Sequence, residues 1–241
     1  PDLGNFEAFT IEMWINVSSF TGNNGLIGSK NWNANVLHFQ LVDGILECVI
    51  HSNEEYLYSI FNFSSNLNKG IHIALTYEQN NLLSLFINGQ LDASVNVTQV
   101  VNLTNLTLGS TYMDIQGRYL DGIIGQIHIS NINQYSENFI PDLDINSDEN
   151  TILIYKLNAG DGGILYDHSG NGNHGTINGA TWKYEIPLNP GANLISFMSL
   201  PEDASVGNVL SPLDGIVTGI IGEGIAASPN PVLGWVGSLT E

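Results

Sequence analysis

The fold of this chain is decided by two adjacent runs, His72–Tyr77 (HIALTY) and Leu83–Gln90 (LSLFINGQ). In each run apolar and polar residues alternate, which is the pattern of a β-strand with one buried and one exposed face. Four polar residues, 78–81 (EQNN), join the runs, and the second run ends in Asn88-Gly89 and Gln90. Asn-Gly is the dipeptide that best adopts the positive φ angles of a tight hairpin turn. The stretch therefore predicts one β-hairpin that leads directly into another.

The same alternation extends over most of the N-terminal half. From Phe9 to about Ser130, short alternating runs are separated by Asn, Gly, Ser and Asp, and no stretch keeps a helical period. This spacing is typical of an all-β protein in which two antiparallel sheets pack face to face. The predicted strands are Thr10–Val17, Gly25–Ser29, Val36–Val42, Ile45–His51, Tyr56–Phe61, Gly70–Tyr77, Leu82–Ile87, Gln90–Asn96, Asn105–Gly109 and Ile123–Ser130.

The charge of the chain restricts its partners. Lys and Arg total 5 against 24 Asp and Glu, which gives a formal net charge of −19 over 241 residues. Nucleic acid would be repelled rather than neutralised, and an anionic membrane surface is disfavoured for the same reason. The sequence also lacks an apolar run of about 18 residues, so membrane insertion is not expected. A calcium ion or a neutral glycan is a compatible ligand.

The surface composition is typical of extracellular β proteins. Only 12% of the residues are charged, so thirty Asn, together with Ser and Thr, must solvate most of the surface. The single cysteine, Cys48, has no partner for an intramolecular disulfide and is expected to be a buried small hydrophobic residue. We therefore expect an extracellular or cell-surface location, with a secreted chain already processed before Pro1 or a fragment.

Four ordered segments resemble the laminin-G-like branch of the concanavalin A-like lectin/glucanase superfamily. They are Phe9–Ile15, His72–Tyr77, Leu83–Gly89 and Tyr119–Asn131, which correspond to an early strand, the central antiparallel pair and the closing strand of that sandwich. The resemblance implies a jelly-roll β-sandwich that serves surface recognition or structure rather than catalysis. The acidic residue that the family usually has near Gly125 is absent, which weakens the case for the family's edge calcium.

The segment that opens domains of this family resembles a later part of the chain. Members carry a strand that would lie before Pro1, whereas residues 152–177, with the run Asp167–Gly175 (DHSGNGNHG), are similar to that opening segment. An acidic loop, 131–150, precedes a predicted strand at Thr151–Leu157. Either these elements fold back to close the first sandwich, or a second copy of the domain begins at Ile152.

A proline-bounded segment, Pro187–Gly191, interrupts the strand pattern and predicts a domain boundary. We divide the chain into a laminin-G-like sandwich with its acidic loop and closing segment, 1–186, and a smaller β-rich unit, 187–241, which we expect to be incomplete. The smaller unit resembles a short β module found near the ends of secreted bacterial multidomain proteins. In it we predict strands at Ala192–Met198, Ile216–Gly222 and Gly234–Leu239 and a short helix at Ser205–Leu213 with Ser205 as N-cap.

Catalytic residues are not predicted. Hydrolysis of a glycoside needs two carboxylates across a groove, and no paired acidic motif is present. Glu12 and Glu47 are single acidic residues in otherwise apolar strands and are expected to face the solvent, whereas Trp14 is expected in the core. The six His are scattered, so nucleophilic catalysis of the Ser-His-Asp or Cys-His kind has no local support either.

Two stretches have the alternating oxygen ligands of a calcium loop. The first consists of Asp142, Asp144, Asn146 and Asp148, although Ser147 stands where such loops have Gly. Leu153 stands where they have Glu, so a solvated acidic loop is the alternative. The second stretch, Asp167, Ser169, Asn171 and Asn173, carries one charge and is expected to be a hydrogen-bonded turn.

Sugar binding needs planar aromatic rings for the apolar faces of pyranose rings and amides for the hydroxyl groups. Trp32 with Asn33 and Asn35 is the best candidate, and Tyr112 and Tyr119 could line an adjacent loop. A half-buried tryptophan of the sandwich is the alternative interpretation of Trp32.

These features predict a non-catalytic adhesion or glycan-recognition module of a larger secreted or cell-surface protein, whose partner is a glycan or an extracellular protein. The first alternative is a structural subunit of an extracellular fibre or surface layer, assembled by strand sharing at an unpaired sheet edge. A weaker alternative is the accessory part of a polysaccharide-degrading enzyme.

Overall fold

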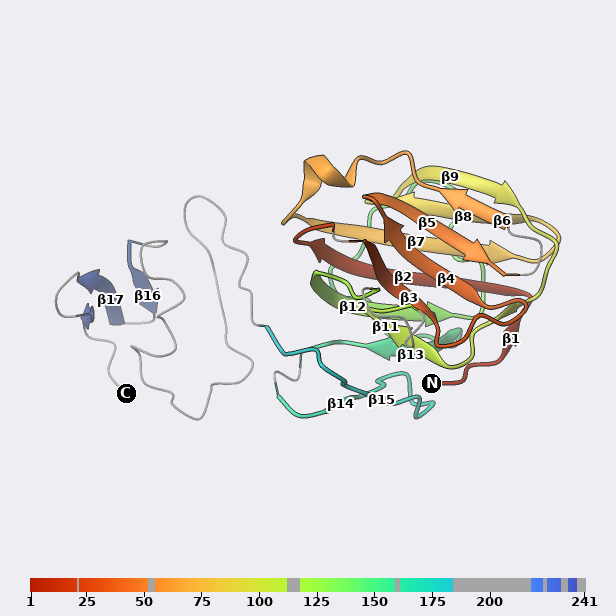
Figure 1. The fold of residues 1–241 in the computed structure, drawn as a ribbon. Coiled ribbons are helices and arrows are strands. Elements are labelled where there is room, and N and C mark those ends of the chain that lie inside the picture. The colour runs from red at the N-terminus through yellow and green to blue at the C-terminus, as the bar shows by residue number, and fades with distance from the viewer. Residues whose placement is uncertain are drawn as a thin grey trace. The chain divides into compact units, whose positions relative to one another are not determined.

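The computed structural model describes residues 1–20, 22–51, 55–111, 118–158, 161–183, 218–222, 225–230 and 234–237. Two antiparallel sheets make up most of the part between Pro1 and Tyr184, which forms one compact unit, while Glu185–Glu241 forms another. In Figure 1, strands β3 to β6 lie over the layer that contains β2, β7 and β8. The all-β sandwich predicted from the alternating pattern is therefore confirmed.

The larger sheet has six strands in the order β13-β12-β2-β7-β8-β9, and every neighbouring pair is antiparallel. Its strands are β2 (Ala8–Val17), β7 (Gly70–Glu78), β8 (Leu82–Ile87), β9 (Gln90–Asn96), β12 (Gly122–Ser130) and β13 (Thr151–Tyr155).

The smaller sheet has five strands in the order β11-β3-β4-β5-β6. Its strands are β3 (Asn23–Ser29), β4 (Leu37–Val42), β5 (Ile45–Ile50), β6 (Glu55–Tyr58) and β11 (Leu106–Leu108). Two short pairs flank the sandwich, β1 (Asn5–Phe6) with β10 (Val101–Asn102) and β14 (Ile164–Leu165) with β15 (Gly175–Thr176). The 3-10 helix η1 (Phe63–Asn66) precedes β7 and is capped by the side chain of Asn62.

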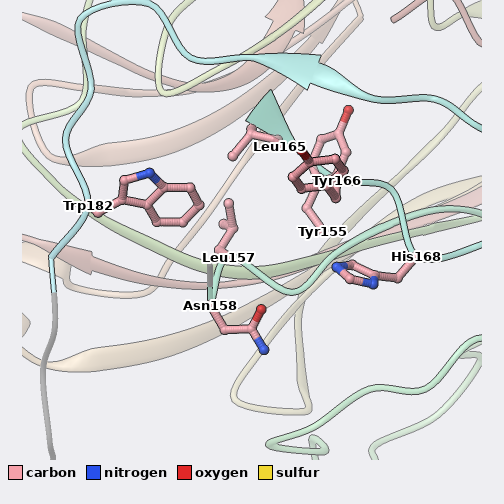
Figure 2. A pocket seen from close by; sticks show the side chains of 7 residues that line it. All are labelled: Tyr155, Leu157, Asn158, Leu165, Tyr166, His168 and Trp182. Atoms are coloured by element: carbon pink, nitrogen blue, oxygen red, sulfur yellow. The ribbon is translucent and has the colours of Figure 1, made fainter. Parts of the chain in front are cut away.

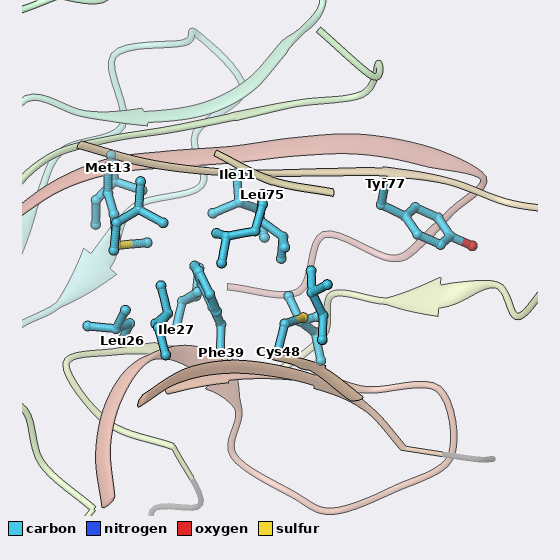
Figure 3. Packing of buried hydrophobic residues seen from close by; sticks show 14 of the residues in the cluster. Ile11, Met13, Leu26, Ile27, Phe39, Cys48, Leu75 and Tyr77 are labelled. Carbon is cyan, nitrogen blue, oxygen red and sulfur yellow. The ribbon is translucent and has the colours of Figure 1, made fainter. Parts of the chain in front are cut away.

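The core lies between the two sheets. Alternate residues of the central strands, such as Ile11 and Met13 of β2 and Leu75 of β7, face Phe39 of β4 and Cys48 of β5 (Figure 3). All five are fully buried. Each such large apolar side chain contributes about 1.5–3 kcal/mol when it leaves water, so this layer is the main source of stability. The prediction that Cys48 is a buried hydrophobic residue is confirmed.

Two tight turns set the register of the hairpins. Asn88 and Gly89, with φ of 50° and 75°, join β8 to β9, and Asp43 and Gly44, with φ of 50° and 81°, join β4 to β5. Both pairs have the positive angles of a two-residue hairpin turn. A side chain at Gly89 would also collide with the carbonyl group of Phe139, which passes over the turn.

Residues 151–155 close the first sandwich. Strand β13 pairs with β12 in the register Ile127↔Tyr155 and Ser130↔Thr151. The strand therefore belongs to the same sandwich as β2, and the alternative that it opens a second copy is wrong. It also covers the edge of β12, so this edge is not available for strand sharing.

The second unit contains a three-stranded antiparallel sheet of β16 (Ile220–Gly222), β17 (Ile225–Asn230) and β18 (Gly234–Gly237). Strands β16 and β18 fall within two of the predicted strands. The predicted strand at 192–198 and the predicted helix at 205–213 lie outside the described residues, and the assignment of 187–241 as an incomplete β module stays a prediction. Within the described part of the chain, no helix has the length and apolar character needed to cross a bilayer.

Candidate functional site

The outer face of the five-stranded sheet carries two rows of side chains. Because Leu37, Phe39 and Leu41 of β4 point into the core, His38 and Gln40 point outward. Strand pairing extends each of these two positions into a row that runs across the sheet from β3 to a tyrosine of β6. We call the surface formed by the two rows the tyrosine face. Its rows are Gly28-His38-Val49-Tyr56 and Gly25-Gln40-Glu47-Tyr58.

Two tyrosine rings stand at the open end of these rows. Tyr56 is 37% exposed and Tyr58 is 52% exposed, and their ring planes are 4° apart with centroids separated by 5.8 Å. Leu57 between them is buried in the core, so the alternation of β6 fixes both rings on the outer face. Large aromatic side chains exposed side by side are typical of recognition surfaces, because the rings offer contact area with little loss of side-chain entropy.

Polar groups beside the tyrosines are held by a chain of hydrogen bonds. Gln40 Nε2 donates to Glu47 Oε1 (2.8 Å), and Thr111 Oγ1 donates to Gln40 Oε1 (2.9 Å). Arg118, the single arginine of the chain, contacts the same Gln40 oxygen through Nη1 (3.4 Å). Because Gln40 Oε1 accepts two donors, its amide is fixed with Nε2 toward Glu47.

Glycines on β3 allow this arrangement. A side chain at Gly25 would collide with the backbone of Ser110 and Thr111, and one at Gly28 would approach the methyl group of Thr111 to 2.8 Å. The segment that carries Thr111 therefore lies directly on β3, which brings its hydroxyl group within reach of Gln40. Of the β5 members of the rows, Val49 is buried and Glu47 is partly exposed, while both tyrosines of β6 are exposed.

An aromatic cluster stands at one end of the face. The Trp32 ring stacks on His51, with centroids 4.3 Å apart and planes 25° apart, and makes an edge contact with His38 at 4.5 Å. Burial lowers the pKa of His38 to about 4, so this ring is uncharged at neutral pH. Its Nε2 faces the carbonyl oxygen of Ser29 (3.1 Å) and therefore carries the proton.

The structure places the predicted ligand-binding residues in different surroundings. Trp32 and Asn33 lie together, because the Asn33 carbonyl group contacts His51 Nδ1 (2.9 Å). Asn35 has a φ of 66° and accepts a backbone hydrogen bond from Asn102 (2.7 Å), so its backbone shapes the turn. Tyr119 is 58% exposed and pairs with Ser110, while Tyr112 lies outside the described residues.

Sequence reasoning missed Gln40, Glu47, Tyr56, Tyr58 and Arg118 as members of one surface. The spacing Tyr-x-Tyr in a predicted strand was the available signal, because residues two apart share a face. The two tyrosines lie near Gln40 and Arg118 because of the strand order and because the segment with Thr111 packs on β3. Neither feature can be predicted from a local sequence pattern.

A second polar cluster lies on the outer face of the six-stranded sheet, and it corrects two predictions. Glu12 was expected to face the solvent, but it is 1% exposed. Trp14 was expected in the core, but it lies partly buried on the outer face and donates its indole N–H to the carbonyl group of Asp142 (3.1 Å). Both residues alternate with Ile11 and Met13 of the core and therefore face outward, and the segment 131–150 lies across this side of β2 and buries Glu12.

Glu12 is bound by three groups. It accepts hydrogen bonds from His128 Nδ1 (2.9 Å), Tyr135 Oη (3.0 Å) and His72 Nε2 (3.2 Å). Burial alone would raise the pKa of Glu12, but the hydrogen bonds and charge of His128 and His72 outweigh it and lower the pKa to about 2. Glu12 is therefore a buried carboxylate with its partners already in place, and the covering segment shields it from any substrate.

His128 links Glu12 to a third strand. Its Nδ1 donates to the carboxylate of Glu12, and its Nε2 lies 3.0 Å from Thr151 Oγ1 of β13. The hydroxyl group of Thr151 in turn donates to Asp148 Oδ1 (2.8 Å). The cluster is thus a hydrogen-bonded network around a buried carboxylate beneath residues 131–150.

The four predicted calcium ligands have protein partners instead of a common centre. Asp144 Oδ1 accepts from Lys156 Nζ (2.5 Å), and Asn146 donates to the backbone of Asp144 (3.2 Å). Asp148 accepts from Thr151, and Asp142 is held by Trp14 through its carbonyl group. Over the described residues, no group of three or more His, Cys, Asp or Glu is arranged to hold a metal ion. Calcium binding by this segment stays a prediction.

The second stretch is a hydrogen-bonded turn, as predicted. Asp167 Oδ1 accepts from the backbone N–H groups of Ile154 (3.1 Å) and Ser169 (3.0 Å), and Oδ2 accepts from that of Asn173 (2.9 Å). These bonds fasten the loop 167–174 to β13 and lower the pKa of Asp167 against the opposing effect of burial.

One solved structure with this fold is a protein of Bacteroides ovatus, and two others resemble the chain more weakly. A predicted carbohydrate-binding protein from Bacteroides ovatus is 21% identical at a TM-score of 0.62, over 77% of this chain and 56% of that protein, so the chain spans little more than half of its length. A native heptameric SAP-like pentraxin from Limulus polyphemus is 11% identical at a TM-score of 0.44, over 56% of this chain and 68% of that one. The CBM40 of the IT-sialidase from Ruminococcus gnavus is 16% identical at a TM-score of 0.42, over 54% and 79%. At these identities the likeness concerns the fold alone.

The sequence itself gives the family. No curated protein matches the chain. The family described as the concanavalin A-like lectin/glucanases superfamily, in its laminin-G form, matches residues 1–138, which is more than half of the 241 residues. The resemblance of the four ordered segments is thereby confirmed, and the chain belongs to the concanavalin A-like lectin/glucanases superfamily.

Proposed function

We propose that this chain is a non-catalytic glycan-recognition module and that the tyrosine face binds the glycan. The observation that carries the proposal is the exposure of Tyr56 and Tyr58 beside the hydrogen-bonded pair Gln40–Glu47. The C–H faces of a pyranose ring pack against aromatic rings, and its hydroxyl groups need donors and acceptors at fixed positions. Both requirements meet on this one surface.

Electrostatics favour a neutral glycan. Glu47 adds a carboxylate to the face, His38 is uncharged at neutral pH, and the chain as a whole carries a net charge of −19. A polyanionic glycan would be repelled by this field, whereas the hydroxyl groups of a neutral sugar can donate to Glu47. The single cation of the face, Arg118, is engaged with Gln40.

The other hypotheses receive less support. Assembly of a fibre by strand sharing cannot use the edge of β12, because β13 of the same chain already pairs with it. The acids on the two outer faces do not form a catalytic pair, since Glu12 is buried beneath residues 131–150 and Glu47 lies on the opposite sheet. An extracellular or cell-surface setting is part of the proposal, as is a place within a larger protein.

A glycan array with the wild-type chain identifies the ligand, and titration calorimetry with variants then tests the face. Tyr58→Ala should weaken binding about tenfold, because it removes one ring contact. Leu91→Ala is the matched control, since Leu91 is also 52% exposed but lies on β9 of the other sheet.

The polar half of the face is tested in the same way. Glu47→Gln should weaken binding because it removes a charged acceptor, while Glu137→Gln, an exposed acid on the other face, should not. Unchanged affinity in both Tyr58→Ala and Glu47→Gln would contradict the proposal, and so would a wild-type chain that binds nothing across a broad array.

A further inference from the structure

One residue of the sandwich has a backbone conformation that its side chain does not favour. Among the described residues, seven that are not glycine have a positive φ, and six of these are Asn or Asp. The seventh is Leu157, with a φ of 51°. Asn and Asp tolerate this region through local hydrogen bonds of their side chains, which leucine cannot make. Such sparsely populated conformations concentrate at binding and active sites.

Leu157 lies in a pocket at the end of β13. The pocket is lined by Tyr155, Leu157, Asn158, Tyr166, His168 and Trp182, together with Leu165. Figure 2 shows the indole of Trp182 on one side of Leu157 and the rings of Tyr155 and Tyr166 on the other. The centres of water molecules can occupy about 20 Å³ of the pocket, little more than one water. It can therefore take one hydroxyl or hydroxymethyl group, while the ring that carries this group rests on the mouth of the pocket.

Hydrogen bonds hold two of the aromatic rings in place. Tyr155 Oη donates to the carbonyl group of Asn173 (2.6 Å), and Trp182 Nε1 donates to that of Gly162 (2.9 Å). The polar edges of these rings are thus satisfied within the protein, which leaves their apolar surfaces to line the pocket. Fixing the rings beforehand lowers the entropy that a ligand must lose on binding.

Three polar side chains at the same pocket have no such partner. The amide of Asn158, the imidazole of His168 and the hydroxyl group of Tyr166 make no hydrogen bond to the described residues, and all three residues are exposed. Together they offer both donors and acceptors around an aromatic-walled hollow. An apolar peptide side chain would use only the rings, whereas a hydroxyl-rich ring would use the rings and the polar groups.

We infer that this pocket is a second glycan subsite, which takes one neutral pyranose residue at the end of a glycan. The inference rests on the proposed function for its class of ligand, but its residues are separate from the tyrosine face. That face lies on the five-stranded sheet, while the pocket adjoins β13 of the six-stranded sheet. Two separate subsites would let the module contact two branches of one glycan or two neighbouring chains.

The test uses the indole N–H signals of the four tryptophans in the nitrogen-15 spectrum of the full chain. Trp→Phe variants assign the signals of Trp14, Trp32, Trp182 and Trp235. The probes are the methyl glycosides of glucose, galactose, mannose and N-acetylglucosamine. We expect at least one of them to move the Trp182 signal with saturation near 1 mM or above, a weak affinity of about 4 kcal/mol. The signal of Trp14 should stay in place, because its N–H is already bound to the carbonyl group of Asp142.

Variants distinguish this subsite from the tyrosine face. Tyr166→Ala should abolish the movement of the Trp182 signal, whereas Tyr58→Ala should leave it unchanged, and the amide spectrum reports whether each variant is folded. A Trp182 signal that no probe moves, or that still moves in folded Tyr166→Ala, overturns the inference. Movement of Trp32 alone overturns it while the proposed function stands. Movement of the Trp182 signal alone supports the second subsite and counts against glycan binding by the tyrosine face.

Discussion

The two sheets of the sandwich differ in what lies over their outer faces. On the six-stranded sheet, residues 131–150 cover β2, so Glu12 is bound by His72, His128 and Tyr135 and excluded from water. On the five-stranded sheet, Thr111 packs on β3 and hydrogen-bonds to Gln40 of β4, whereas Glu47 is partly exposed and the tyrosines of β6 are exposed. Identical alternation in the strands thus produces a buried carboxylate cluster on one face and an exposed pair of tyrosines on the other. The difference lies in the loops and not in the strands.

The largest expected effect separates the two glutamates. Glu12→Ala removes the buried acceptor of His72, His128 and Tyr135 and leaves these donors without a partner, which should lower the free energy of unfolding by about 3–5 kcal/mol. Glu47→Ala should lower it by less than about 1 kcal/mol, since Glu47 is partly exposed. Urea unfolding at neutral pH measures both, and equal losses would contradict the contrast between the faces.

The pH dependence should follow the buried face. The pKa of Glu12 is lowered from 4.5 to about 2 in the folded chain, so its contribution is present above pH 4.5 and is lost as the pH falls toward 2. The loss amounts to about 3 kcal/mol over this window. Acid unfolding of Glu12→Gln, compared with Glu47→Gln and the wild type, isolates the contribution. If Glu12→Gln showed the same loss of stability with falling pH as the wild type, the loss could not be assigned to Glu12.

A smaller effect tests whether residues 131–150 hold Glu12. Tyr135→Phe deletes the hydroxyl group that donates to Glu12, and hydrogen bonds to a charged group contribute about 1.5–3 kcal/mol. Tyr58→Phe deletes the same atom on the open face and should change the free energy of unfolding by less than about 0.5 kcal/mol. If both variants unfold at the same urea concentration, residues 131–150 do not hold Glu12 as described.

The smallest effect concerns the calcium prediction. Asp144 is 77% exposed in its pair with Lys156, and exposed pairs contribute about 0–1 kcal/mol. Asp144→Asn should therefore change stability only slightly in the presence of a chelator. A calcium ion held by residues 142–148 would add a chelator-sensitive increase in Tm that Asp144→Asn removes. Identical melting curves with calcium and with chelator would contradict the calcium prediction.

Local patterns predicted much of the fold. The observed strands begin and end near the predicted bounds, because alternation and the turns at Asp43-Gly44 and Asn88-Gly89 act over a few residues. The burial of Glu12 could not be predicted in this way, because the segment that covers it lies more than a hundred residues further along the chain. The outward position of Trp14, by contrast, follows from the same alternation that places Ile11 and Met13 in the core. The sequence also left open whether β13 pairs with β12 or begins a second copy of the domain, because this pairing too joins residues that are distant in the sequence.

The candidate site was predicted only in part. Trp32 and Asn33 were identified from residue type, and the structure places them beside His38 and His51. The pair Tyr56 and Tyr58 was assigned to a strand but not to a surface, since strand order decides which outward rows become neighbours. The positive φ of Leu157 has no counterpart in the sequence pattern at all.

The most direct test of the account compares one glycan's affinity for two double variants of the full chain. Tyr56→Ala/Tyr58→Ala removes the rings of the tyrosine face, and Ile140→Ala/Leu143→Ala removes two side chains, 92% and 82% exposed, from the segment that covers the other sheet. The account predicts that the first variant loses at least about tenfold in affinity while the second binds like the wild type. Equal affinity in the two variants, or a loss confined to the second, would contradict it.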